Sequence, residues 1–137
     1  MNTLRRTFIV MAVSCGAAWL AKMAAIAANG GSGSTLIGIL WGIGMVTFLL
    51  AAATGTALLL ARAPVWARIA AGVAAVPVSF WLLDVLGLAI KSVYVSDSWL
   101  RDEVALIVAG VVFAAIGLSL ARTSTRTSAG SSTRQHA

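Results

Sequence analysis

Four long apolar blocks constrain the fold of this sequence more than any other feature. They cover about residues 7–28, 35–61, 68–90 and 104–121. A helix of about 20 such residues crosses the roughly 30 Å hydrocarbon core of a bilayer. The composition agrees, with 60% hydrophobic and 10% charged residues, against roughly 45–50% and 25% in soluble domains. The sequence therefore predicts an all-α polytopic membrane protein with four transmembrane helices in an antiparallel bundle.

Polar or helix-breaking segments separate these blocks and end the last one. Asn29–Ser34 is a glycine/serine turn, and Arg62–Arg68 combines a proline with interfacial arginine and tryptophan. Lys91–Glu103 mixes charges with aromatic residues, which predicts an interfacial loop. Residues 123–137 are basic and rich in serine and threonine, so we expect a disordered cytoplasmic tail. Residues 1–122 then form one transmembrane domain.

The basic residues beside the spans predict the orientation. With four crossings, one side holds Arg5, Arg6, Arg62, Arg68, Arg122, Arg126 and Arg134, and the other holds Lys91 and Arg101. Lys and Arg concentrate in cytoplasmic loops. We therefore expect a multi-pass protein of the plasma membrane, the inner membrane of a bacterial cell, with both termini cytoplasmic. Anionic lipid at the cytoplasmic face accounts for the net charge of +6 without a nucleic-acid partner.

The first block also admits a second interpretation, as a secretory signal peptide. Arg5 and Arg6 precede an apolar run, and Ala25–Ala27 has the small residues of a cleavage site. Cleavage there would leave three spans. Lys22 interrupts the run where a signal peptide is normally neutral, and the run is long enough to cross the membrane uncut, so the intact helix is favoured.

Two ionisable residues, Lys22 and Asp84, fall well inside predicted spans. Lys22 follows Thr7 by 15 positions and Asp84 follows Arg68 by 16, so both reach nearly the same depth from the cytoplasmic side. An unpaired Lys or Asp at the centre of a span costs roughly 2.5–3.5 kcal/mol. We therefore expect an intramembrane charge pair. The alternatives are a snorkelling lysine with a neutral, hydrogen-bonded aspartic acid, or a working ion or proton site.

Aromatic residues and a proline accompany these charges. Trp19 and Trp81 each precede one of them by three positions, which places each indole on the same helix face as its charge. Trp41 lies in the outer half of the second span. These indoles either support the charges or belong to an interfacial belt. Pro77, in the middle of the third span, predicts a kink that serves packing or forms a hinge.

Small residues at four-residue spacing predict close helix packing. Gly38 and Gly42 form a GxxxG motif in the second span, and Gly110 and Ala114 have the same spacing in the fourth. Small residues let membrane helices approach each other closely. The GxxxG motif is compatible with self-association and with contacts inside one bundle.

The reactive residues argue against an enzyme. Cys15 is the only cysteine and His136 the only histidine, so the sequence predicts no disulfide, no metal site, no catalytic triad and no cofactor. The loop acids Asp97, Asp102 and Glu103 lack the spacing of metal ligands.

Two architectures resemble this one. Four short spans with internal termini resemble the small multidrug resistance transporters, which depend on a glutamate in the first helix. This chain has Lys22 there, and Asp84 would have to replace that acid. The small-residue helix faces and basic tail resemble phage holins. We expect a non-enzymatic membrane protein that acts by self-association or within a membrane complex, a holin-like pore being one version. The alternative is a small ion- or proton-coupled transporter or channel that uses Asp84 and Lys22.

Overall fold

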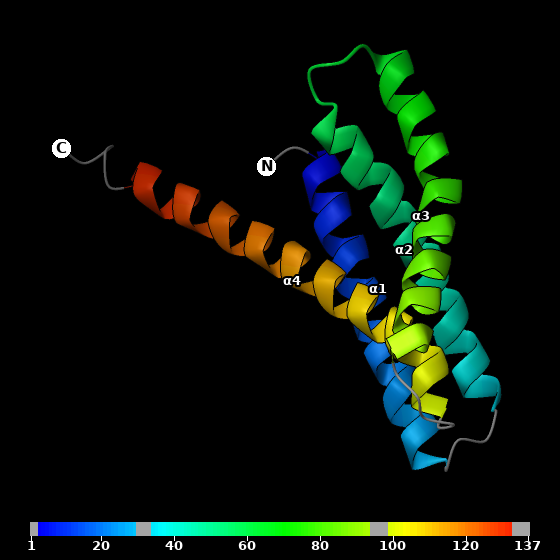
Figure 1. Cartoon of the computed structure of the whole chain (residues 1–137). Coiled ribbons are helices and arrows are strands. Elements are labelled where there is room, and N and C mark those ends of the chain that lie inside the picture. Colours follow the sequence, from blue (N-terminus) through cyan, green and yellow to red (C-terminus); the bar gives the residue numbers. More distant parts are fainter. Residues whose placement is uncertain (1–2, 30–33, 94–98, 133–137) are drawn as a thin grey trace.

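The computed structural model describes residues 3–29, 34–93 and 99–132, and this part of the chain forms four helices (Figure 1). They are α1 (Thr3–Ala28), α2 (Thr35–Leu59), α3 (Val65–Val93) and α4 (Trp99–Ser132). Each contains a stretch long and apolar enough to cross a membrane. The expected all-α class with four such helices is therefore confirmed, and it indicates a multi-pass membrane protein.

The connection between α3 and α4 is shorter than the predicted interfacial loop. Lys91 lies in the last turn of α3, and Glu103 lies within α4. Only residues 94–98 separate the two helices, and they fall outside the described residues. A basic residue at a helix C-terminus and an acidic residue near an N-terminus both interact favourably with the helix dipole. Lys91 and Glu103 therefore favour helix ends at positions where the sequence pattern predicted a loop.

The end of α4 also differs from the prediction. The backbone stays helical through Ser132, so residues 123–132 are not the disordered segment that their composition predicted. Extending an existing helix avoids the costly nucleation step, so even a Ser/Thr-rich segment can continue one. In Figure 1 this end of α4 stands clear of the other helices. Residues 133–137 of the predicted tail lie outside the described residues.

Helix α1 lies at the centre of the packing and α3 at its edge. Within the described residues the backbone of α1 lies close to α2 and α4, the backbone of α3 lies close to the same two helices, and the backbones of α1 and α3 do not approach each other closely. Phe8 of α1 lies against Gly55 of α2, and Trp19, farther along α1, lies against Gly44. Residue numbers thus rise along α1 as they fall along α2. The contacts between α1 and α4 have the same reversed order.

The core is built on the inward face of α1. Its buried apolar residues recur every three or four positions, as one helix face requires: Phe8, Ala12, Cys15, Trp19, Met23 and Ile26. The Trp19 and Phe48 rings lie 5.3 Å apart, and Phe48 meets Phe113 of α4 edge-on at 5.2 Å. These three aromatic rings join α1, α2 and α4.

The buried cysteine provides a direct measure of folding. Cys15 is fully buried in the cluster that contains Trp19 and Phe48. We expect the folded protein in detergent to resist N-ethylmaleimide at this thiol and the denatured protein to react fully, because the reagent must reach the sulfur. Mass spectrometry of the labelled chain checks this, and rapid labelling under native conditions would contradict the packing of α1.

Candidate functional site

The strongest polar contact inside the helices joins Lys22 of α1 to Glu103 of α4. Lys22 Nζ donates to both carboxylate oxygens, at 2.6 Å to Oε1 and 2.7 Å to Oε2. The side chains are 6% and 19% exposed, so the pair is largely enclosed by the protein. Charge-assisted bonds of this length belong to the strong class of hydrogen bonds. The pair satisfies Lys22 without any contribution from α3.

The predicted partner of Lys22 was therefore wrong. Lys22 binds Glu103, and Asp84 makes no hydrogen bond or ion pair with any described residue. The reason is the order of the helices around the bundle. The backbones of α1 and α3 do not approach each other closely, so equal depth in the two helices does not bring Lys22 and Asp84 together.

The sequence analysis placed Glu103 in a loop and so missed it as a site residue. The structure puts it in the second turn of α4, about 6 Å along the helix from Trp99. Acidic residues are enriched near the starts of helices. That signal was present in the sequence, because Asp102 and Glu103 immediately precede the last apolar block.

Asp84 lies on the open side of α3. It lines a groove of about 550 Å³ between α3 and the α2 and α4 helices, together with Lys91, Gly87 and Leu106. Asp84 is an exposed residue in the middle of a helix that can span a membrane. A carboxyl group exposed in hydrocarbon is costly unless it is neutral or meets a partner. Among the described residues, Asp84 is thus an exposed carboxyl group in mid-helix without a hydrogen-bond or ion-pair partner.

The three tryptophans take different places. Trp19 is fully buried, and its Nε1 has no hydrogen-bond partner among the described residues, so its N–H supports no charge and the ring does not lie at an exposed interfacial belt. Its indole instead faces Gly44 on the neighbouring helix. Trp41 is 46% exposed and Trp81 63% exposed. Trp81 and Asp84 lie one turn apart on the same helix, as their spacing predicts.

The small residues also divide into two groups. Gly110 and Ala114 lie in the contact between α1 and α4, where Gly16 packs against both. Gly38 and Gly42 face open space, since a Cβ atom at either would meet nothing within 4 Å. The GxxxG motif thus makes no close packing contact with the described helices. Pro77 lies within α3, which continues past it as one helix.

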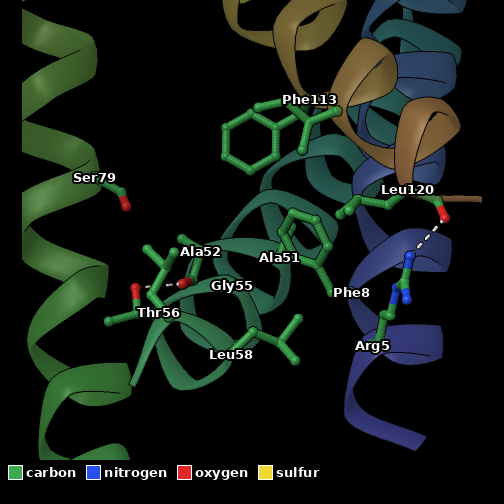
Figure 2. Close-up of a pocket in the computed structure, with 12 residues that line it drawn as sticks. Arg5, Phe8, Ala51, Ala52, Gly55, Thr56, Leu58, Ser79, Phe113 and Leu120 are labelled. Atoms are coloured by element: carbon green, nitrogen blue, oxygen red, sulfur yellow. Dashed lines mark hydrogen bonds between the residues drawn. The ribbon is translucent and has the colours of Figure 1, made fainter. Parts of the chain in front are cut away.

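A second cavity, of about 580 Å³, lies at the end of the helices where α1 begins (Figure 2). Its walls come from all four helices and are apolar except at a few positions. Arg5 stands at one edge and donates from Nη2 to the Leu120 carbonyl at 3.0 Å. Two hydroxyl residues, Thr56 and Ser79, contribute the remaining polar lining.

Neither the metal-ligating side chains of the described residues nor the comparisons with known proteins point to a function. Among the described residues, no three His, Cys, Asp or Glu side chains gather closely enough to hold a metal ion. Comparison with protein-family models, with curated proteins and with solved structures finds no match to this chain.

Proposed function

We propose that this chain is a non-enzymatic subunit of a membrane assembly and that α3 is the helix through which two copies associate. The observation that carries this proposal is Asp84, a carboxyl group exposed in mid-span without a partner among the residues that the structure describes. The burial of the helices agrees. In the most apolar stretch of each helix, 44% of the α1 residues are buried, against 0% in α3.

The proposed setting is an antiparallel four-helix bundle in the plasma membrane, with both termini cytoplasmic. In Figure 1 the start of α1 and the connection from α2 to α3 lie at the same end. Arg5, Arg6, Arg62 and Arg68 therefore gather at that end. This distribution supports a cytoplasmic position for it by the positive-inside rule.

The face of α3 is self-complementary, which favours a second copy as its partner. Trp81 has an indole N–H donor and Asp84 has carboxylate acceptors, one helical turn apart. In a two-fold dimer of equally inserted chains, the two α3 helices run parallel near the axis. Each Trp81 then donates to the Asp84 of the other chain, because a two-fold interface repeats every contact. Leu88, 69% exposed, extends the same surface by one more turn.

Oxidative cross-linking in native membranes tests this interface. We expect a Leu88→Cys variant to form a disulfide-linked dimer of twice the chain mass. Val10→Cys, on the exposed side of α1 at 50% exposure, should form little. The wild type is the negative control because Cys15, its one cysteine, is buried. Equal cross-linking from both variants, none from Leu88→Cys, or an adduct to a different protein would contradict self-association through α3.

Two substitutions of Asp84 test whether its carboxyl group takes part in association. Asp84→Asn keeps an oxygen that accepts a hydrogen bond, so cross-linking through Leu88→Cys should persist. Asp84→Leu removes it from both chains and should lower cross-linking by at least roughly a hundredfold, as expected for the loss of two hydrogen bonds to charged groups. Undiminished cross-linking in Asp84→Leu would remove Asp84 from the interface.

Ion or proton transport is the second candidate function, because Asp84 lines a groove that also contains Lys91. A potential-sensitive dye in induced cells distinguishes the candidates. A holin-like pore built by association would collapse the membrane potential in the wild type and in Asp84→Asn, but not in Asp84→Leu. Ion or proton conduction that needs an ionisable Asp84 would be lost in both Asp84→Asn and Asp84→Leu. An intact potential in all three would indicate association without conduction.

A further inference from the structure

The first half of α3 is tied closely to α2. The guanidinium of Arg68 donates to three backbone carbonyls where α2 ends and the connection to α3 begins, those of Leu60, Ala61 and Ala63. One turn farther along, Gly72 lies against Ala53 of α2, so closely that a Cβ atom on the glycine would come within 3.5 Å of the Ala53 carbonyl oxygen. Among the described residues of α3, Gly72 alone is buried. This half of the helix is therefore anchored.

The second half of α3 borders cavities. Three of them, of about 580, 190 and 550 Å³, lie between α3 and its neighbours, and every α3 residue in their walls follows Pro77. Figure 2 shows Ser79 at the first cavity, on the opposite side from Phe113. The first and second cavities share these two residues, and the second and third share Leu83. The cavities thus follow one another along α3.

The second cavity separates side chains that could pack together. Leu82 and Leu86 of α3 form one wall, and Phe48 of α2 and Phe113 of α4 form the other. Protein interiors contain few voids larger than a water molecule. An inward movement of the second half of α3 would bring the leucines onto the aromatic rings and fill this space.

Pro77 lies where such a movement can begin. Proline has no backbone N–H, so the carbonyl of Val73, one turn earlier, lacks its hydrogen bond within the helix. Sharp helix kinks of more than about 20° occur mainly at proline. Val93 follows Pro77 by 16 positions, about 24 Å, so a change of about 20° in the kink moves the end of α3 by about 8 Å.

We propose that residues 78–93 form an arm that pivots about Pro77, between the splayed position of the structure and a closed position packed on α2 and α4. The arm carries Trp81, Asp84 and Leu88, so this inference rests on the proposed association through α3 and adds its regulation. Closure carries Asp84 toward Leu106 of α4, which lies across the third cavity, and away from a partner. A second copy bound to the arm therefore holds the splayed position, because a ligand favours the state that it binds better.

Distances between pairs of nitroxide labels, measured by pulsed electron paramagnetic resonance, test the pivot. The full chain is labelled in detergent, where the buried Cys15 stays unlabelled, and is then reconstituted sparsely in lipid vesicles. Leu20→Cys with Val93→Cys joins α1 to the arm, and Val93 lies on the opposite face of α3 from Asp84. We expect two distances, about 8 Å apart, for this pair.

Two controls separate the pivot from general mobility. Val10→Cys with Val73→Cys, both exposed, joins α1 to the anchored half of α3 and should give one distance. Pro77→Ala allows the missing backbone bond to form and should leave one distance for the arm pair. Protection of Cys15 from maleimide shows that each variant is folded. One distance for the arm pair with Pro77 present, two for the control pair, or two that persist in Pro77→Ala would overturn the pivot.

An excess of unlabelled wild-type chain in the same vesicles tests the regulation. We expect the arm pair to shift to the distance of the splayed position, as labelled chains acquire unlabelled partners. Two distances that the unlabelled chain does not shift would overturn the regulation. Dimer cross-linking from Leu88→Cys is scored separately, so failure of the proposed association is distinguishable from failure of the pivot.

Discussion

Replacing Lys22 by methionine is expected to lower the free energy of unfolding by about 3 kcal/mol, because it leaves the Glu103 carboxylate enclosed without its partner. Methionine keeps most of the length of the side chain, so the loss reports the charge rather than the packing. The denaturant concentration at which Cys15 becomes reactive toward maleimide measures the change. Glu103→Gln should lower the free energy of unfolding by a similar amount, because it removes the other charge of the pair.

A double-mutant cycle identifies the true partner of Lys22. Lys22→Met combined with Glu103→Gln should cost clearly less than the sum of the two single changes, because residues in contact are energetically coupled. Lys22→Met combined with Asp84→Leu should be additive, since the backbones of α1 and α3 do not approach each other closely and Lys22 pairs with Glu103. The exchange of charges in Lys22→Glu with Glu103→Lys should recover part of the stability. Additivity with Glu103 and coupling with Asp84 would reverse the assignment made here.

The second large effect is expected at Gly44. A Cβ atom added there would overlap the Trp19 indole, striking Nε1 and Cδ1 of a ring that is rigid and fully buried. Overpacking of this kind costs typically 1–3 kcal/mol, and a rigid ring favours the upper end, so we expect Gly44→Ala to destabilise the protein by about 3 kcal/mol. The same maleimide assay of Cys15 provides the measurement.

Gly38 offers a matched control on the same helix. A Cβ atom there meets nothing within 4 Å, so Gly38→Ala should be neutral or stabilise α2 by up to about 1 kcal/mol through helix propensity. Trp19→Phe introduced beside Gly44→Ala should recover part of the loss, because the smaller ring vacates the space. Equal effects of the two glycine substitutions would show that Trp19 does not lie against α2.

Some features of the site followed from local rules and others did not. Lys22 was identified correctly as a residue that needs a partner, because the cost of a charge in a span depends only on its own position. Gly110 and Gly38 both begin a pair of small residues four positions apart, yet one packs between α1 and α4 and the other faces outward. The spacing of small residues shows that a helix has a small-residue face, but it does not show whether another helix packs against that face.

The loop assignment failed for a related reason. Lys91 and Glu103 are charged, and charge between two apolar blocks normally indicates a connection. Both fit within helix ends because they complement the helix dipole, and Glu103 also gains Lys22 as a partner. That partner lies 81 positions away in the sequence, beyond the reach of any local pattern.

Hydropathy along the chain by itself determined that there are four helices of membrane-spanning length, since the thickness of a bilayer sets how many apolar residues a crossing needs. The tertiary structure alone decided which helices are neighbours and how each is rotated about its axis. Those two properties depend on side chains meeting across helices, and they are why Lys22 is neutralised by Glu103 while Asp84 stays exposed on α3.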